Sequence, residues 1–271
     1  MMKMDLGGVA ETLLITLYIR AKDAKNAHPV LNDRKAAELI EKIDYDFSKF
    51  DSAWASYYGI LARAKIMDRE AAKFIEKYPD CVVVSVGCGL DTRFDRIDNS
   101  RIRWYNLDLP EVIEKRRFLL PDSPRSISIG KSALDASWPQ DIEWQGKKLL
   151  IISEGVLMYM EESEVKAFLS ILSDSFDDFE AQFDLMYKGL VKKAACHDVV
   201  KKTSAEFHWG VSNGSEITQL NPAFKQLACI NFTDEMRHLL PGLLKLLTPF
   251  FYLTNNRLGI YTCQKPVPSP A

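Results

Sequence analysis

The chain has 271 residues, of which 47% are hydrophobic and 27% charged, and its 35 lysines and arginines against 37 aspartates and glutamates give a formal net charge of −2. These proportions are those of a globular protein and exclude a disordered, collagen-like or coiled-coil chain. The near balance of charge provides no broad basic field, so we expect no nucleic-acid partner and no membrane partner.

The five cysteines are widely spaced and include no C-x-x-C pair. This pattern predicts neither a disulfide framework nor a zinc site, and it favours a reducing, cytoplasmic location. No apolar run approaches the ~18 residues that a membrane span requires. The apolar run from Thr12 to Ile19, within Met1 to Lys22, is interpreted as an amphipathic helix rather than a signal peptide.

Residues 1–78 are predicted to form a helical cap. Asn32 and Asp33 are typical helix-capping residues, and the apolar residues after them follow helical spacing. A longer apolar stripe with the same spacing predicts a helix over residues 53–78.

From residue 79 onward, strands and helices alternate. Strands are predicted at residues 81–86, 102–107, 126–129, 148–153 and 181–186, with helices at 111–120 and 162–176. This alternation predicts an α/β fold with a parallel, doubly wound sheet that carries helices on both faces.

The alternation of strands and helices stops between residues 187 and 227, a stretch of mixed, polar composition. We interpret this stretch as a lid inserted into a core domain of residues 79–265. Thr233 is then expected to cap a helix. Residues 250–254 and 258–263 are predicted to form a closing hairpin across two asparagines. The proline-rich residues 266–271 are predicted to be a disordered tail.

Ligands of such sheets bind beyond the carboxyl ends of the strands. Gly87, Cys88 and Gly89 follow the first core strand, and glycines there let backbone approach a ligand closely. The third glycine of a dinucleotide fingerprint is replaced by Thr92, and Asp91 would repel a pyrophosphate. The loop therefore favours a nucleoside without phosphates, although a tight turn alone would also explain the glycines.

Three acidic residues stand at the expected strand ends. Asp108 is placed to accept hydrogen bonds from ribose hydroxyls, or else to cap the helix that begins at Pro110. Asp135 is placed to accept from an adenine amine, or else to form an Asx turn. Glu154 is placed to face a cationic ligand, or else to cap a helix.

Three blocks together resemble the leucine carboxyl methyltransferase family. They are Gly87-Cys88-Gly89-Leu90-Asp91-Thr92-Arg93, Asp108-Leu109-Pro110-Glu111-Val112 and Glu154-Gly155-Val156-Leu157-Met158-Tyr159. The resemblance extends from about residue 11 to residue 264. Within the family, the chain is most similar to bacterial small-molecule O-methyltransferases associated with polyketide biosynthesis.

The resemblance implies a class I S-adenosylmethionine-dependent methyltransferase with a seven-stranded, Rossmann-like sheet whose last strand is antiparallel. It also implies the residues that contact the cofactor: Arg63 at its carboxylate, Gly87 and Gly89 at its methionine part, Asp108 at the ribose, Asp135 beside the adenine and Glu154 in the pocket wall, with Cys88, Leu109 and Leu134 as further cofactor-binding residues. The family often has Asp-Leu-Arg before the tryptophan matched by Trp138, and this chain departs from that pattern.

The expected reaction is transfer of a methyl group from the sulfonium to an oxygen of a small molecule. A carboxylate acceptor would need no general base, whereas a hydroxyl would need one within ~3 Å. We predict Arg93, Tyr159 and His208 as residues of the catalytic end, with His197 and His238 as further candidate bases. No metal-binding cluster is expected.

Three other functions stay open at this point. They are a nicotinamide-dependent oxidoreductase, a non-catalytic nucleoside-binding regulator and a methyltransferase of protein carboxyl termini. The sequence also leaves open whether the chain is a monomer or a homodimer.

Overall fold

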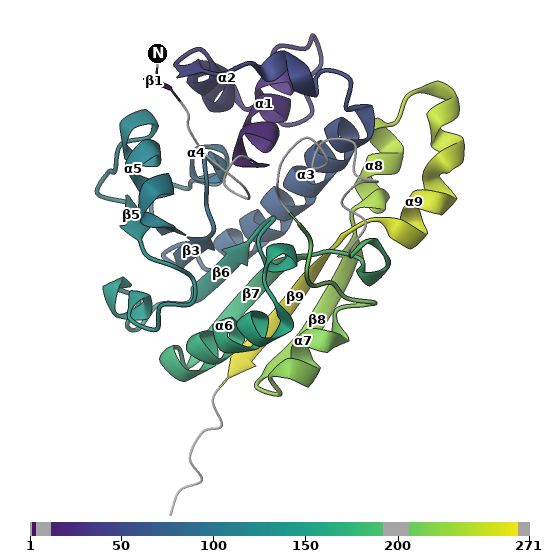
Figure 1. The fold of residues 1–271 in the computed structure, drawn as a ribbon. Helices are drawn as coiled ribbons and strands as arrows, with labels where there is room; N and C mark the ends of the chain where they lie inside the picture. Colours follow the sequence, from purple (N-terminus) through teal and green to yellow (C-terminus); the bar gives the residue numbers. More distant parts are fainter. Residues whose placement is uncertain (1, 4–11, 192–205, 265–271) are drawn as a thin grey trace, which may run out of the picture.

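The computed structural model describes residues 2–3, 12–191 and 206–264 (Figure 1). Within these ranges lies a seven-stranded sheet of order β5-β4-β3-β6-β7-β9-β8. Its strands are β3 (Val82–Val86), β4 (Arg103–Asp108), β5 (Ser126–Gly130), β6 (Leu149–Ser153), β7 (Asp178–Leu185), β8 (Phe224–Asn231) and β9 (Arg257–Gln264). β9 runs antiparallel to both of its neighbours, β7 and β8, while the other strand pairs are parallel, which confirms the predicted direction of the last strand.

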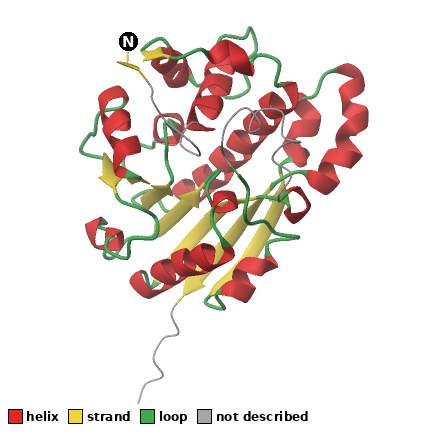
Figure 2. Cartoon of the chain, in the orientation of Figure 1, coloured by secondary structure: helices red, strands yellow, loops and turns green. Residues whose placement is uncertain are grey.

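Helices surround this sheet (Figure 2). They are α1 (Thr12–Ala24), α2 (Arg34–Ile40), α3 (Trp54–Lys77), α4 (Arg93–Ile97), α5 (Pro110–Leu119), α6 (Glu162–Ser175), α7 (Ser215–Leu220), α8 (Thr233–Leu239) and α9 (Thr248–Thr254). Short 3₁₀ helices span Phe47–Phe50, Trp138–Asp141, Leu157–Tyr159, Lys188–Leu190 and Gly242–Leu247, and β1 (Met2–Lys3) pairs with β2 (Ile43–Asp44).

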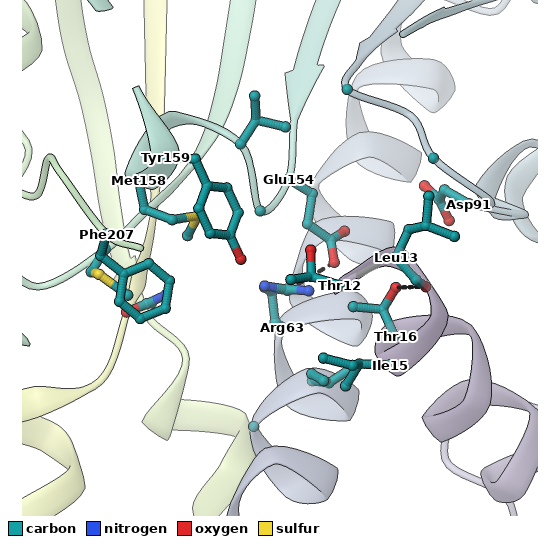
Figure 3. A pocket seen from close by; sticks show the side chains of 18 of the residues that line it. Thr12, Leu13, Ile15, Thr16, Arg63, Asp91, Glu154, Met158, Tyr159 and Phe207 are labelled. Atoms are coloured by element: carbon teal, nitrogen blue, oxygen red, sulfur yellow. Dashed lines mark hydrogen bonds and ion pairs between the residues drawn. The ribbon is translucent and has the colours of Figure 1, made fainter. Parts of the chain in front are cut away.

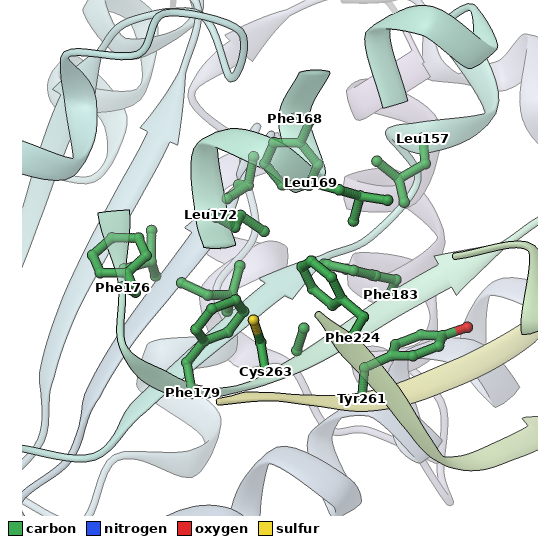
Figure 4. Packing of buried hydrophobic residues seen from close by; sticks show 14 of the residues in the cluster. Leu157, Phe168, Leu169, Leu172, Phe176, Phe179, Phe183, Phe224, Tyr261 and Cys263 are labelled. Carbon is green, nitrogen blue, oxygen red and sulfur yellow. The ribbon is translucent and has the colours of Figure 1, made fainter. Parts of the chain in front are cut away.

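The central strands are buried on both faces, as continuous apolar runs require. Every residue of β3 and β6 is buried. On one face the α6 side chains Phe168, Leu169 and Leu172 pack against strand side chains that include Phe183 (Figure 4). On the other face, the second half of α3 packs against β3, β4 and β6.

The N-terminal helices form a separate packing layer. α1 packs on α2 and α3, and Asp33 caps α2 as predicted, because its side chain accepts a hydrogen bond from the backbone N–H of Ala36. The first half of α3 contacts this layer while its second half contacts the sheet. One long helix thus holds the N-terminal layer over the carboxyl ends of the parallel strands.

The predicted closing hairpin is wrong. Residues 248–254 form helix α9, and the partner of β9 is β8, which runs antiparallel to it. Proline at the start of α9 suits a first helical turn, and the aromatic and leucine residues that suggested a strand also fit a helix. Thr233 is the first helical residue of α8 rather than its cap, since the Asn231 side chain accepts from the Thr233 backbone N–H.

The predicted insertion at 187–227 is described at both ends only. Tyr187 bridges to Val211, and α7 follows. The last four residues of the stretch belong to β8, so the insertion is shorter than predicted at that end. The role of this stretch as a lid stays a prediction, and residues 266–271 lie outside the described part of the chain.

Candidate active site

A sharp backbone turn follows β3. Gly87 and Gly89 have φ angles of +64° and +47°, a conformation that favours glycine. A Cβ atom on Gly87 would lie 2.2 Å from Cγ2 of Val156, and one on Gly89 would lie 3.2 Å from Cβ of Leu13. The turn therefore requires glycine for both conformation and space, and it leaves the backbone exposed toward a neighbouring cavity.

Asp108 ends the adjacent strand β4 and anchors this turn. Its carboxylate accepts hydrogen bonds from the backbone N–H of Gly89 at 2.7 Å and of Leu109 at 2.8 Å. Burial raises the pKa of the Asp108 carboxyl above its usual value. A carboxylate has acceptor capacity for more than two hydrogen bonds, so Asp108 retains acceptor capacity toward the cavity.

A cavity of about 690 Å³ opens between the strand ends and the helices α1, α3, α8 and α9. Of the residues predicted for the site, those that line it are Arg63, Gly87, Cys88, Gly89, Asp108, Leu109, Leu134, Glu154 and Tyr159. Its volume lies within the usual range of small-molecule sites. Nine predicted residues from widely separated segments thus converge on one space.

Arg63 and Glu154 form an ion pair in the wall of the cavity (Figure 3). Nε of Arg63 lies 2.8 Å from Oε1 of Glu154. This contact is an ion pair, but the Nε–H group is not aligned for a hydrogen bond. Burial disfavours the charged form of both groups. The carboxylates of Glu154 and Asp184 nevertheless raise the pKa of Arg63. The guanidinium groups of Arg63 and Arg93 lower the pKa of Glu154. Both groups are therefore charged at neutral pH.

Asp184, on β7, completes the group and was missed in the sequence. Its Oδ2 accepts from Nη1 of Arg63 at 3.0 Å and from the backbone N–H of Gly155 at 3.1 Å. The side chain is fully buried, and among the described residues its Oδ1 has no hydrogen-bond partner. Asp184 follows the alternation of polar and apolar residues along β7 (DFEAQFDL), which is typical of a strand with one solvated face, so no signal in the sequence marks it as a buried site residue.

This burial gives Asp184 a testable effect on stability. Burial raises the pKa of Asp184 to about 6, well above the usual value of an aspartate, so near pH 5 the folded chain holds a proton there that the unfolded chain has released. Stability from this group is present at low pH and decreases as the pH rises, by about 1.4 kcal/mol between pH 5 and pH 7. We expect the Asp184→Asn variant to lose this component, so that its unfolding free energy relative to wild type rises over that range in urea titrations. A constant difference would contradict the assignment.

Arg93 does not line the cavity, so its predicted catalytic role stays a prediction that its position does not support. Its side chain is 1% exposed and donates to Asp68 at 2.6 Å, to Asp91 at 2.8 Å and to Glu154 at 2.5 Å. Burial opposes the charge, but Asp91 and Glu154 raise the pKa of the guanidinium well above its usual value. Since each nitrogen already has a carboxylate partner, Arg93 positions Glu154 and the glycine loop instead of contacting a substrate.

Asp135 and His208 also lie outside the cavity lining. Asp135 forms the Asx turn that was its alternative interpretation, accepting from the backbone N–H of Ser137 at 2.8 Å. The His208 ring lies 3.0 Å from Glu161, and its side chain is 38% exposed. His238 does not line the cavity either, and His197 lies outside the described residues. Neither His208 nor His238 is placed as a general base.

The other end of the cavity is apolar. Tyr159 lines it, with its ring centroid 5.5 Å from that of Phe207, and Met158 and Met186 pack nearby (Figure 3). Burial raises the pKa of the Tyr159 phenol, so it stays protonated at neutral pH. Methionine and aromatic side chains adapt to flat apolar ligands. The cavity thus has a charged end at the glycine loop and an apolar end beside Tyr159.

The described ranges contain neither a metal-binding cluster nor a helix that could span a membrane. No group of three or more histidine, cysteine, aspartate or glutamate side chains is arranged to hold a metal ion there. None of the helices in that part of the chain is both long and apolar enough to cross a membrane.

Comparison with known proteins gives consistent matches. A family model described as leucine carboxyl methyltransferase matches residues 14–173. The chain is 32% identical over 221 residues to the tetracenomycin polyketide synthesis O-methyltransferase TcmP of Streptomyces glaucescens, covering 81% of this chain and 82% of that protein. It is 27% identical over 247 residues to the S-adenosyl-L-methionine-dependent methyltransferase dpfgK of Gibberella zeae, covering 82% of each.

A solved structure shows the same fold. It is that of a candidate methyltransferase from Thermobifida fusca YX, which superposes with a TM-score of 0.59 at 14% identity and covers 91% of this chain and 94% of the other.

Proposed function

The chain belongs to the leucine carboxyl methyltransferase family, and from this premise we propose that its cavity holds the cofactor at the charged end and a small-molecule acceptor at the apolar end. The protein is an S-adenosylmethionine-dependent O-methyltransferase with the Rossmann-like class I fold. The observation that carries the proposal is the convergence of the glycine loop, Asp108 and the Arg63–Glu154 pair on one cavity.

The net charge of the charged end is opposite in sign to that of S-adenosylmethionine. Asp91, Asp108 and Glu154 line this end of the cavity together with Arg20 and Arg63, a formal balance of three acidic against two basic groups, or −1. The cofactor has an ammonium, a sulfonium and a carboxylate, a net of +1. The glycine loop adds backbone with no side chain at Gly87 and Gly89, where a Cβ atom would meet Val156 and Leu13.

We assign the cofactor contacts to the chain's own residues as follows. Asp108 accepts hydrogen bonds from the ribose hydroxyls, and Leu109 and Leu134 enclose the adenine. Arg63 binds the carboxylate, and Glu154 attracts the ammonium. These assignments are supported by the position of each residue in the cavity lining. Asp135, at an exposed turn, has no part in this assignment.

The bound cofactor supplies a methyl group already activated on a positively charged sulfur. The chain therefore has to position an acceptor oxygen in line with that methyl group and exclude water. Helices α1 and α3 and the aromatic residues at the apolar end enclose the reacting space. No described histidine lines it, and Tyr159 is protonated, so we propose a carboxylate acceptor, whose own charge makes a base unnecessary.

A matched panel tests the acceptor class. Purified protein is incubated with isotopically labelled S-adenosylmethionine and pairs of aromatic acceptors that differ only in their oxygen group, such as 1-naphthoic acid and 1-naphthol. We expect methyl esters from the acids by mass spectrometry and little methyl ether from the alcohols. Ethers without esters would show that a hydroxyl is the acceptor and that a base has been overlooked.

Arg63 offers a test of the cofactor's orientation. Because its proposed partner is the cofactor carboxylate, Arg63→Met is expected to weaken S-adenosylhomocysteine binding at least tenfold, from the loss of a charge-assisted hydrogen bond. Affinity for 5′-methylthioadenosine, which lacks the amino-acid part, is expected to be unchanged. Calorimetry with both ligands distinguishes this from damage to the cavity, which would weaken both.

We also propose that the protein acts in the cytoplasm. The proposal is supported by three described cysteines, Cys81, Cys88 and Cys229, that are free thiols. Burial raises the pKa of Cys81 to about 12, so that thiol is unreactive at neutral pH.

A further inference from the structure

The most exposed apolar part of the molecule is a helical segment between α8 and β9. Residues 242–254, here called the apolar segment, comprise the 3₁₀ helix Gly242–Leu247 and helix α9, and neither helix has a buried residue. Six large apolar side chains are between 41% and 83% exposed: Leu243, Leu246, Leu247, Phe250, Tyr252 and Leu253. The segment contains one charged residue, Lys245.

The apolar segment is attached to the rest of the molecule along one side only. Leu244 and Phe251 pack against Ala62 of α3 and against Met236 and Leu240 at the end of α8. The opposite side projects at the periphery of the molecule (Figure 1). The segment is thus held in place by two inward side chains while most of its apolar surface faces solvent.

The exposed area is large for a protein that acts alone. A leucine or aromatic residue has on the order of 200 Å² of surface, so the exposed parts of the six side chains amount to roughly 750 Å². The largest apolar patch of a typical monomer covers about 300–600 Å², whereas a stable interface buries about 800 Å² from each partner. The apolar segment therefore has the size of one half of an interface.

The polar groups of the segment do not oppose its burial. The Thr248 hydroxyl donates to the carbonyl oxygen of Lys245 at 2.6 Å, and the Thr254 hydroxyl donates to that of Phe250 at 3.1 Å. Both hydroxyls therefore keep a hydrogen-bond partner in an interface. The long Lys245 side chain can keep its ammonium group at the rim.

We propose that the apolar segment is the contact surface of a homodimer. A surface that is almost uniformly apolar is complementary to its own copy, so a twofold axis brings leucine and aromatic side chains together without burying an unpaired charge. A lipid bilayer is the other apolar partner to consider. Helices that bind at membrane surfaces carry several lysines and arginines on their polar face, and the single Lys245 in a chain of net charge −2 does not provide this.

The dimer would meet beside the active site, since Phe250, Phe251 and Thr254 also line the cavity. The same helix would then carry the interface on one side and part of the acceptor wall on the other. The proposal does not depend on the identity of cofactor or acceptor.

Sedimentation velocity of the full chain tests the proposal. Interfaces of this size have dissociation constants from micromolar to picomolar. At protein concentrations between roughly 1 and 100 µM, we therefore expect the wild-type protein to sediment as a particle with twice the mass of one chain. Leu246→Glu and Leu253→Glu are expected to weaken dimerisation at least tenfold while circular dichroism stays unchanged. Phe118→Glu, at a 69% exposed site on α5, is the matched control and is expected to remain dimeric.

Three outcomes would overturn the proposal. The first is a wild-type chain that stays monomeric over the whole range, and the second is a pair of glutamate variants that dimerise like wild type. The third is a monomeric wild type that pellets with phosphatidylcholine vesicles, which would assign the apolar segment to a membrane surface instead.

Discussion

Replacing Arg93 with methionine is expected to lower the free energy of unfolding by about 3–5 kcal/mol, the usual result of breaking a buried ion pair from one side. Arg93 is 1% exposed and is the common partner of Asp68, Asp91 and Glu154. Without it, three carboxylates lie close together with two guanidinium groups, because Asp68 and Asp91 share Arg96 and Glu154 retains Arg63. The charge left without compensation destabilises the fold around the glycine loop.

Urea titration measures this loss, and Arg101→Met is the matched control. Arg101 is also paired with an aspartate, Asp80, at 2.5 Å, but its side chain is 58% exposed. An exposed pair of this kind contributes less than about 1 kcal/mol. Equal losses for the two variants would show that the buried network around Arg93 does not stabilise the fold.

Replacing Asp108 with alanine is expected to weaken cofactor binding roughly tenfold or more, because the acceptor of the ribose hydroxyls is lost. The variant also loses the two backbone hydrogen bonds that the carboxylate accepts from Gly89 and Leu109. Some loss of thermal stability is therefore expected, and binding has to be measured below the midpoint of unfolding.

Asp135→Ala is the control for this experiment. Asp135 was predicted beside the adenine, but it lies at an exposed turn outside the cavity lining, so its removal is expected to leave cofactor affinity unchanged. If Asp135→Ala weakens binding as much as Asp108→Ala does, the adenine lies nearer the exposed turn than proposed here.

The sheet was predictable because its strands are short apolar runs that are covered on both faces. Five strands, β3 to β7, match predicted runs, and the helices that follow β4 and β6 begin within one residue of their predicted starts. Residues 248–254 were not predictable in the same way. Leucine and aromatic residues suit a strand or a helix, and only the pairing of β9 with β8 decides between them.

The cavity lining was largely predictable because strand ends converge in space whenever a sheet is parallel. Ion pairing was not, because it depends on which charged side chains meet across the fold. Arg63 and Asp184 are separated by 121 residues, yet Nη1 and Oδ2 lie 3.0 Å apart. In the same way, the sequence allowed Arg93 either to pair with Asp91 or to face a substrate. The structure places Asp68 and Glu154 beside it as well, which favours the ion-paired role.

The central claim is that the charged end of the cavity binds S-adenosylmethionine, and isothermal titration of the wild-type protein tests it most directly. The titrations use S-adenosylmethionine, S-adenosylhomocysteine and NAD in parallel. We expect saturable binding of both sulfur nucleosides and no binding of NAD, since Asp91 lies in the turn that a pyrophosphate would have to occupy. Binding of NAD, or binding of neither sulfur nucleoside, would contradict the central claim.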